Sequence, residues 1–155
     1  MKLDPKTDLT FTRTLNAPRA LLWECWTTPK HIEKFFVPKP HSVTACEIDL
    51  RPGGRFNTTM NVEGNLIEGE GVYLEVVERE RLVFTDSYSE GWKPAADPFM
   101  TAIVEFADDG EGGTIYTVTA RHRSPDARER HEQMGFYNGW GTVATQLEAY
   151  AQTLI

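Results

Sequence analysis

Apolar residues recur along the chain with two different spacings. Leu9, Phe11 and Leu15 alternate with threonines, which predicts a strand over residues 8 to 15 with one buried face. The same period of two returns from residue 43 to residue 122, interrupted by turn-like segments rich in glycine, proline and charge. These stretches predict six further antiparallel strands, near residues 43 to 50, 55 to 62, 66 to 77, 81 to 88, 99 to 107 and 114 to 122. Residues 89 to 98 are too many for a tight turn and form a candidate rim loop.

A spacing of three and four residues marks the helices. Two short helices are expected after the first strand, one beginning near Pro18 and one at Thr28-Pro29, where threonine caps and proline takes the first helical position. Ser124-Pro125 opens a long C-terminal helix with one apolar stripe. That stripe comprises Met134, Tyr137, Trp140, Val143, Ala144, Leu147, Ala151 and Leu154. Three glycines, at 135, 139 and 141, weaken this helix, so a kink or a close approach to the sheet is expected there.

Size and charge narrow the class of protein. A chain of 155 residues with 40% hydrophobic residues predicts a single domain over residues 1–155, with a core over about 8–154. The net charge of −7 and the scattered Lys and Arg residues exclude nucleic acid as an expected partner. No apolar stretch approaches the roughly 20 residues of a membrane span, and the N-terminus lacks the apolar run of a signal peptide, so a cytoplasmic location is expected. A homodimer is possible through a strand edge or the helix surface, but no residue selects a contact.

Several short segments resemble one protein family. They are Ala-Pro-Arg at 17–19, Asp-Leu-Arg-Pro-Gly-Gly-Arg-Phe at 49–56, Glu-Arg-Glu-Arg-Leu-Val-Phe-Thr at 78–85 and Gly-Trp at 139–140. Together with the order of elements, they resemble the family named for the activator of the Hsp90 ATPase, within the Bet v 1 and START-like superfamily, over roughly residues 8 to 154. The resemblance implies an α+β helix-grip fold, in which a curved antiparallel sheet of about seven strands wraps around the long C-terminal helix. It also implies an interior cavity, which relatives often use for hydrophobic or amphipathic small molecules and some use for cyclisation or hydrolysis.

Strand alternation then sorts side chains into a candidate cavity, because the more apolar alternate set should face the helix. Leu74 is placed inward with Val72 by this rule. For any single aromatic residue, simple core packing is the better expectation. The candidate ligand-binding residues are Phe35, Phe36, Phe56, Met60, Val72, Phe84, Asp86, Tyr88, Trp92, Met100, Tyr116, Val118, Tyr137 and Trp140.

Asp86 is the candidate for chemistry, since alternation puts its carboxylate on the apolar face beside Phe84. A buried carboxylate must find a partner. Paired with Arg55, or hydrogen-bonded to a tyrosine, it could orient a ligand or act as a general base, with His122 as the second catalytic candidate. The simpler alternative places Asp86 in water at the strand end. Glu70 carries the same ambiguity.

Other chemistry is not indicated. The histidines lack metal-ligand spacing, so no metal site is expected, and no cofactor is expected either. The glycines at 69 and 71 lie within a strand and predict a bend that curves the sheet. Cys25 and Cys46 are expected to be buried thiols.

Three functions remain open. The leading hypothesis is a binding protein for a small hydrophobic or aromatic molecule. The second is an enzyme of the polyketide cyclase or hydrolase type that uses Asp86 with a tyrosine or histidine. The third is a co-chaperone-like partner of an Hsp90-type ATPase.

Overall fold

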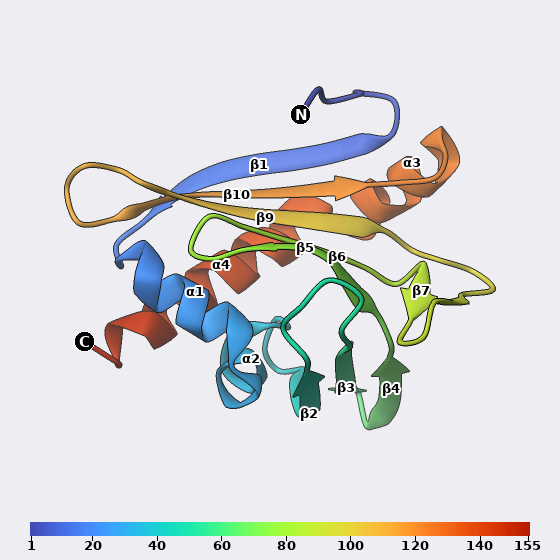
Figure 1. The fold of residues 1–155 in the computed structure, drawn as a ribbon, viewed down its shortest axis with the longest axis horizontal. Coiled ribbons are helices and arrows are strands. Elements are labelled where there is room, and N and C mark those ends of the chain that lie inside the picture. Colours follow the sequence, from blue (N-terminus) through green and yellow to red (C-terminus); the bar gives the residue numbers. More distant parts are fainter.

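The computed structural model describes all residues 1–155 as an α+β fold with strands in the centre of the chain and helices near both ends (Figure 1). In chain order the elements are β1 (Asp8–Leu15), α1 (Arg19–Thr27), α2 (Pro29–Phe35), β2 (Ser42–Ile48), β3 (Phe56–Val62), β4 (Asn65–Gly69), β5 (Val72–Val77), β6 (Arg81–Thr85), β7 (Tyr88–Ser89), β8 (Lys93–Pro94), β9 (Thr101–Asp108), β10 (Thr114–Arg121), α3 (Pro125–Gln133) and α4 (Phe136–Gln152).

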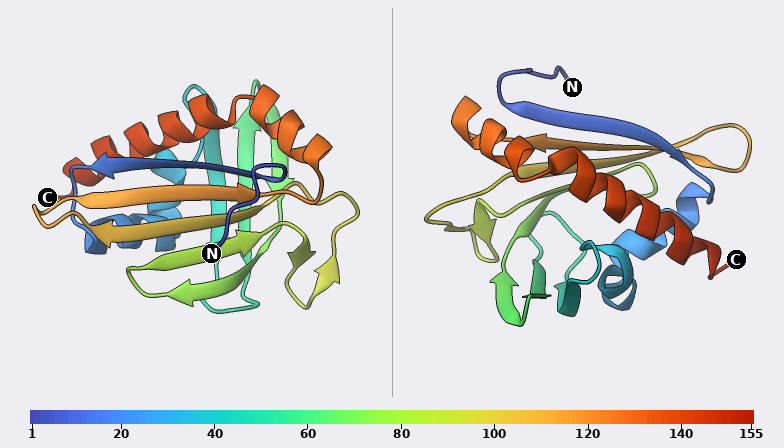
Figure 2. Two further views of the ribbon diagram at one scale, coloured as in Figure 1. Left: turned by 90° about the horizontal axis from the view of Figure 1, so that it is seen from above. Right: turned by 180° about the vertical axis from the view of Figure 1, so that it is seen from behind.

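The sheet is antiparallel and strongly curved, as predicted. Strands β1, β10, β9, β6 and β5 pair in that order, and β2, β3 and β4 pair separately. The two parts join where β4 leads into β5, because the amide of Phe56 donates to the carbonyl of Gly71 at 2.9 Å and the amide of Tyr73 donates to that of Gly54 at 3.0 Å. The single strand predicted over residues 66 to 77 is therefore two strands, β4 and β5. The first pairs with β3 and the second pairs with β6. Figure 2 shows β2 to β4 running across the larger part of the sheet.

Glycine makes this bend possible. A Cβ atom at Gly71 would lie 2.6 Å from the backbone oxygen of Thr85, so a side chain there would collide with the neighbouring strand β6. The predicted bend of the chain is present here, and Gly71 is the glycine that it requires. Alternation fails just beyond, because a bulge between Tyr73 and Glu75 turns Leu74 outward into solvent, contrary to the expectation that it faces the core.

The two short helices follow β1 as predicted, and the second begins at Pro29 with Thr28 at its N-cap. The C-terminal helix differs from the prediction, because it is two helices rather than one. Helix α3 begins after Ser124, whose side chain accepts a hydrogen bond from the amide of Ala127 at 3.1 Å, and the chain then turns at Gly135 with φ of +97° before α4 starts. A residue in this left-handed conformation ends helices, and glycine adopts it without steric cost.

The third glycine of this region, Gly141, allows the expected close approach. Helix α4 passes β1 at Gly141, whose carbonyl accepts a hydrogen bond from Arg13 at 3.0 Å. A Cβ atom at this position would lie 3.2 Å from the same guanidinium group. None of the four helices has the length and apolar character needed to cross a membrane.

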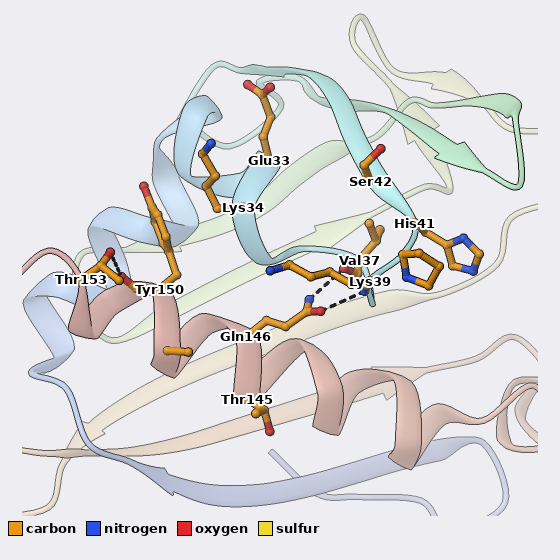
Figure 3. Close-up of a pocket in the computed structure, with 12 residues that line it drawn as sticks. Glu33, Lys34, Val37, Lys39, His41, Ser42, Thr145, Gln146, Tyr150 and Thr153 are labelled. Carbon is orange, nitrogen blue, oxygen red and sulfur yellow. Dashed lines mark hydrogen bonds between the residues drawn. The ribbon is translucent and has the colours of Figure 1, made fainter.

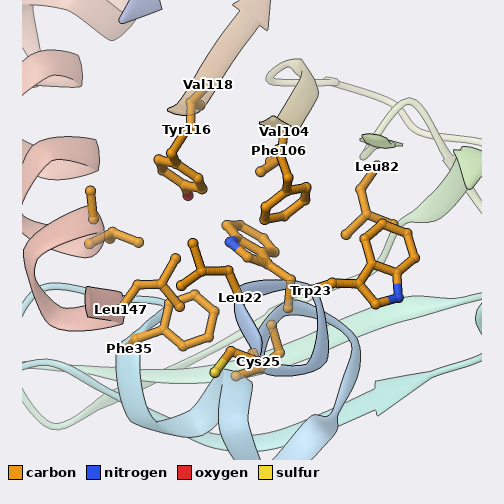
Figure 4. Close-up of a cluster of buried hydrophobic side chains, with 14 of the residues drawn as sticks. Leu22, Trp23, Cys25, Phe35, Leu82, Val104, Phe106, Tyr116, Val118 and Leu147 are labelled. Atoms are coloured by element: carbon orange, nitrogen blue, oxygen red, sulfur yellow. The ribbon is translucent and has the colours of Figure 1, made fainter. Parts of the chain in front are cut away.

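A continuous hydrophobic core fills the centre of the space between the sheet and the helices. Figure 4 shows strand side chains such as Val104 and Tyr116 meeting Leu22, Phe35 and Leu147 from the helices. Each of these five is at most 1% exposed. The middle of the molecule is therefore closed to a ligand, and any cavity must lie towards an end.

Candidate functional site

An apolar cavity lies at one end of this core, where β3, the segment 36–38, residues 99–100 and the start of α4 come together. It has a larger lobe of about 400 Å³ and a smaller lobe of about 200 Å³. Both lobes share Phe36, Met60, Phe99 and Met100, which makes them neighbouring parts of one space. The larger lobe lies against the α3–α4 junction, and the smaller one lies against the bend between β4 and β5.

Aromatic rings form the boundary between the cavity and the core. The ring centroids of Phe36 and Phe56 are 5.6 Å apart, and those of Phe56 and Phe84 are 4.9 Å apart, both in edge-to-face orientation. The indole of Trp140, which lines the larger lobe, stacks on that of Trp26 in the core at 6.3 Å with planes 12° apart. Faces and edges of this kind suit a flat apolar ligand.

One wall of the cavity, the segment 36–38, is held by a glutamine on α4. The side-chain amide of Gln146 donates to the carbonyls of Phe35 at 3.0 Å and Val37 at 2.8 Å, and its oxygen accepts from the amide of Lys39 at 2.9 Å. Pro38 and Pro40 prevent this segment from continuing helix α2. The side chain of Gln146 thus supplies hydrogen bonds to backbone groups that would otherwise be bonded within a helix.

Gln146 also lies in a second hollow, a groove of about 800 Å³ between the α2–β2 connection and α4 (Figure 3). Lys34, His41 and Thr153 are among its lining residues, and only 3 of the 12 are hydrophobic. Because ligand sites are lined predominantly by hydrophobic and aromatic side chains, this groove is the weaker candidate despite its size.

Asp86 holds the opposite wall. Its carboxylate accepts hydrogen bonds from the amide of Phe99 at 2.9 and 2.8 Å and from the amide of Met100 at 3.1 Å. The side chain is half-buried and borders the smaller lobe. Its oxygens therefore position two lining residues through their backbone.

None of the partners expected for Asp86 forms a hydrogen bond with it. Arg55 forms ion pairs with Glu47 and Glu90, each at 3.4 Å. The hydroxyl of Tyr116 faces the indole nitrogen of Trp26 inside the core, but neither atom reaches hydrogen-bonding geometry or has another partner. No tyrosine or histidine hydrogen-bonds to Asp86, and Glu70 is exposed at the rim of the smaller lobe.

His122 lies behind the cavity rather than in its lining. Its Nδ1 is 2.8 Å from the carbonyl oxygen of Thr7, and its Nε2 is 2.8 Å from Nδ1 of His131. His131, in the last turn of α3, borders the larger lobe. Burial, and to a smaller extent the neighbouring His122, lower the pKa of His131 to about 4.

Half of the fourteen candidate ligand-binding residues line this cavity. They are Phe36, Phe56, Met60, Phe84, Asp86, Met100 and Trp140. Four others, Phe35, Val72, Tyr116 and Val118, are buried in the core. The remaining three, Tyr88, Trp92 and Tyr137, are 39%, 56% and 50% exposed and line neither lobe.

Several lining residues were not predicted from the sequence. In the structure Val37, Pro38, Phe99, His131 and Phe136 lie in loops or near helix ends, where strand alternation does not tell which way a side chain faces. The proline pair at 38 and 40 and the proline before Phe99 are the signals that could have marked these walls.

The cysteines and the possible metal ligands add no further chemistry to this site. Cys25 and Cys46 are free, and burial raises the pKa of each thiol to about 12, which keeps both protonated at neutral pH. No group of three or more His, Cys, Asp or Glu side chains converges as metal ligands would.

A curved antiparallel sheet that grips a C-terminal helix, with an apolar cavity beside that helix, defines a helix-grip protein of the START and Bet v 1-like class. Within this class, residues 16–152 match the family described as "Activator of Hsp90 ATPase homolog 1-like protein", and the chain belongs to that family. No curated protein matches the chain.

Solved structures support the assignment. The chain is similar to a protein from Nitrosomonas europaea, with 42% identity, a TM-score of 0.94 and 97% of each chain covered. It is also similar to a protein from Mycobacterium smegmatis, with 30% identity, a TM-score of 0.79 and coverage of 96% of this chain and 93% of that one. An AHSA1-like protein from Aeromonas hydrophila, at 20% identity and a TM-score of 0.69 over 92% of this chain and 94% of that one, shares the fold.

Proposed function

We propose that this protein binds a small apolar molecule, preferably an aromatic one, in the two-lobed cavity beside α4. The observation that carries the proposal is the composition of the larger lobe, in which 9 of 13 lining residues are hydrophobic. Its volume of about 400 Å³ lies within the range of roughly 300–1,000 Å³ typical of small-molecule sites.

Access and shape support the same function. Met134 borders the larger lobe and is 69% exposed, so the lobe reaches the surface at the α3–α4 junction. The aromatic boundary formed by Phe36, Phe56 and Phe84 offers ring faces and edges to a ligand. A ligand could therefore enter the larger lobe from solvent without unfolding of the core.

Binding is favoured over the enzymatic alternative by the hydrogen bonds of Asp86. A general base needs a free lone pair within reach of the proton it abstracts. Two backbone amides, those of Phe99 and Met100, use three of the roughly four acceptor positions of the Asp86 carboxylate, and no tyrosine or histidine hydrogen-bonds to it as a second catalytic group would. Family membership alone does not carry the chaperone hypothesis, because one fold hosts many functions.

Gly139 offers a direct test. It lies in α4 and borders the larger lobe, and a Cβ atom there would meet nothing within 4 Å. Gly139→Leu should fill the lobe while adding helix propensity of up to about 1 kcal/mol. Asn138→Leu is the matched control, since Asn138 is exposed on the same helix and lines neither lobe.

The experiment combines native mass spectrometry of the purified protein with thermal-shift titration by naphthalene. The wild type and Asn138→Leu should retain a co-purifying molecule or show a rise in melting temperature, because a ligand that binds the folded state stabilises it. Gly139→Leu should show neither. Equal binding by a folded Gly139→Leu protein would contradict the proposed site.

A further inference from the structure

His131 gives the larger lobe one strong side-chain hydrogen-bond acceptor. Among the 13 residues that line this lobe, only His131 and Trp140 carry side-chain nitrogen, and none carries side-chain oxygen. An indole nitrogen can only donate a hydrogen bond. The imidazole can accept one if the nitrogen that faces away from His122 carries no proton.

The hydrogen bonds of the histidine pair determine which nitrogen that is. The carbonyl oxygen of Thr7 can only accept, so the proton of the 2.8 Å contact lies on Nδ1 of His122. In the neutral ring, Nε2 of His122 is then an acceptor. The 2.8 Å contact between the two rings therefore takes its proton from Nδ1 of His131, which leaves Nε2 of His131 with a free lone pair.

The surroundings of His131 disfavour its charged form. His122 and His131 are 8% and 6% exposed, and no carboxylate forms an ion pair with either ring. Phe99 and Phe136 pack against His131, with ring centroids 4.5 and 5.2 Å away. Such an environment disfavours the imidazolium, in agreement with the lowered pKa of His131.

The Nε2 atom of His131 has no hydrogen-bond partner within the protein, although the ring borders the cavity. A ligand that fills the lobe without a donor would displace water from this nitrogen and leave it unsatisfied, which is unfavourable. A ligand with an O–H or N–H group at the correct edge would satisfy it.

We propose that the natural ligand is an apolar aromatic molecule carrying one hydrogen-bond donor, an aromatic N–H or hydroxyl, which donates to Nε2 of His131. This proposal rests on the proposed function and narrows its ligand class. The chain from the carbonyl of Thr7 through His122 to His131 fixes the acceptor in place. The ligand body then lies against the aromatic boundary of the cavity.

Indole and benzofuran test this proposal, because the two molecules have nearly the same shape. Indole carries an N–H donor at the position where benzofuran carries an oxygen acceptor. Isothermal titration of the wild type should give a Kd for indole about tenfold lower than that for benzofuran, the ratio expected for one satisfied hydrogen bond. His131→Phe should bind both with similar affinity, because it retains an aromatic ring and loses the acceptor. His131→Gln, which retains an acceptor oxygen, should keep part of the preference for indole.

The outcomes separate the two proposals. If both compounds bind with equal affinity to the wild type, the cavity binds aromatic molecules but the role of His131 is overturned. A preference for indole that persists in His131→Phe would overturn it as well. If neither compound binds the wild type while naphthalene also fails in the thermal-shift titration, the proposed function itself is wrong. The comparison within the wild type remains decisive even if His131→Phe does not fold.

Discussion

Lowering the pH from about 7 to about 4.5 is expected to destabilise the fold through His131. In the folded protein, burial beside His122 lowers the pKa of His131 from its ordinary value of 6.5 to about 4. In the unfolded chain, the same side chain is in water and titrates near 6.5. Between these two values the unfolded chain binds a proton that the folded protein does not.

The sign and size of the effect follow from linkage. Because the unfolded state binds more protons between about pH 6.5 and about pH 4, the free energy of unfolding falls as the pH falls through this window and levels off below it. A difference of about 2.5 pH units, at about 1.36 kcal/mol each, gives a loss of about 3 kcal/mol. That is a large fraction of the roughly 5–15 kcal/mol by which domains are stable.

Urea denaturation at a series of pH values would measure this loss. The His131→Phe protein has no imidazole at this position, so its free energy of unfolding should fall by about 2–3 kcal/mol less than that of the wild type between about pH 7 and about pH 4.5. His41→Gln is the control, since His41 lies on the α2–β2 connection and its side chain makes no hydrogen bond. If wild type and His131→Phe lose stability in parallel, His131 is not a buried neutral group.

Two further substitutions test the remaining polar groups of the core and the cavity. Asp86→Ala should destabilise the protein by about 1–3 kcal/mol and weaken ligand binding, because it leaves the amides of Phe99 and Met100 without their acceptor. Asp86→Asn keeps one oxygen and should lose less stability. Equal losses of the two variants in urea denaturation would argue against this role. Tyr116→Phe removes a buried hydroxyl that has no hydrogen bond, so it should leave the free energy of unfolding unchanged or raise it by about 1 kcal/mol. A loss of more than about 1 kcal/mol would reveal a partner for that hydroxyl.

Most of the fold could be predicted because local signals and the global fold agree. The seven predicted stretches of alternation correspond to the main strands, and proline at 29 and 125 marks two helix starts. The errors fall where one backbone conformation overrides a periodic pattern. The bulge after Tyr73 reverses the direction of Leu74, and the left-handed turn at Gly135 divides a helix whose apolar stripe appears continuous in sequence.

The candidate site was harder to predict, because alternation tells which face of a strand is buried but not what fills the space in front of it. Trp26 and Tyr116 occupy the centre, so residues in the middle of the strands became core and only those near one end, such as Met60, line the cavity. The other walls come from Phe99 and His131, whose positions depend on how a loop and a helix end pack together.

The polar residues around the cavity divide into two kinds. Asp86 and Gln146 both form hydrogen bonds to backbone groups. Asp86 accepts from the amides of residues 99 and 100, and Gln146 bonds to the segment 35–39, so each holds one wall of the cavity. His122 is likewise satisfied by Thr7 and by its neighbouring ring. Among the residues that line the larger lobe, only His131 ends such a chain with an unused side-chain acceptor. A polar side chain that is fully satisfied can shape a site without contacting its ligand, so the unsatisfied one is where specificity for a ligand donor should be sought.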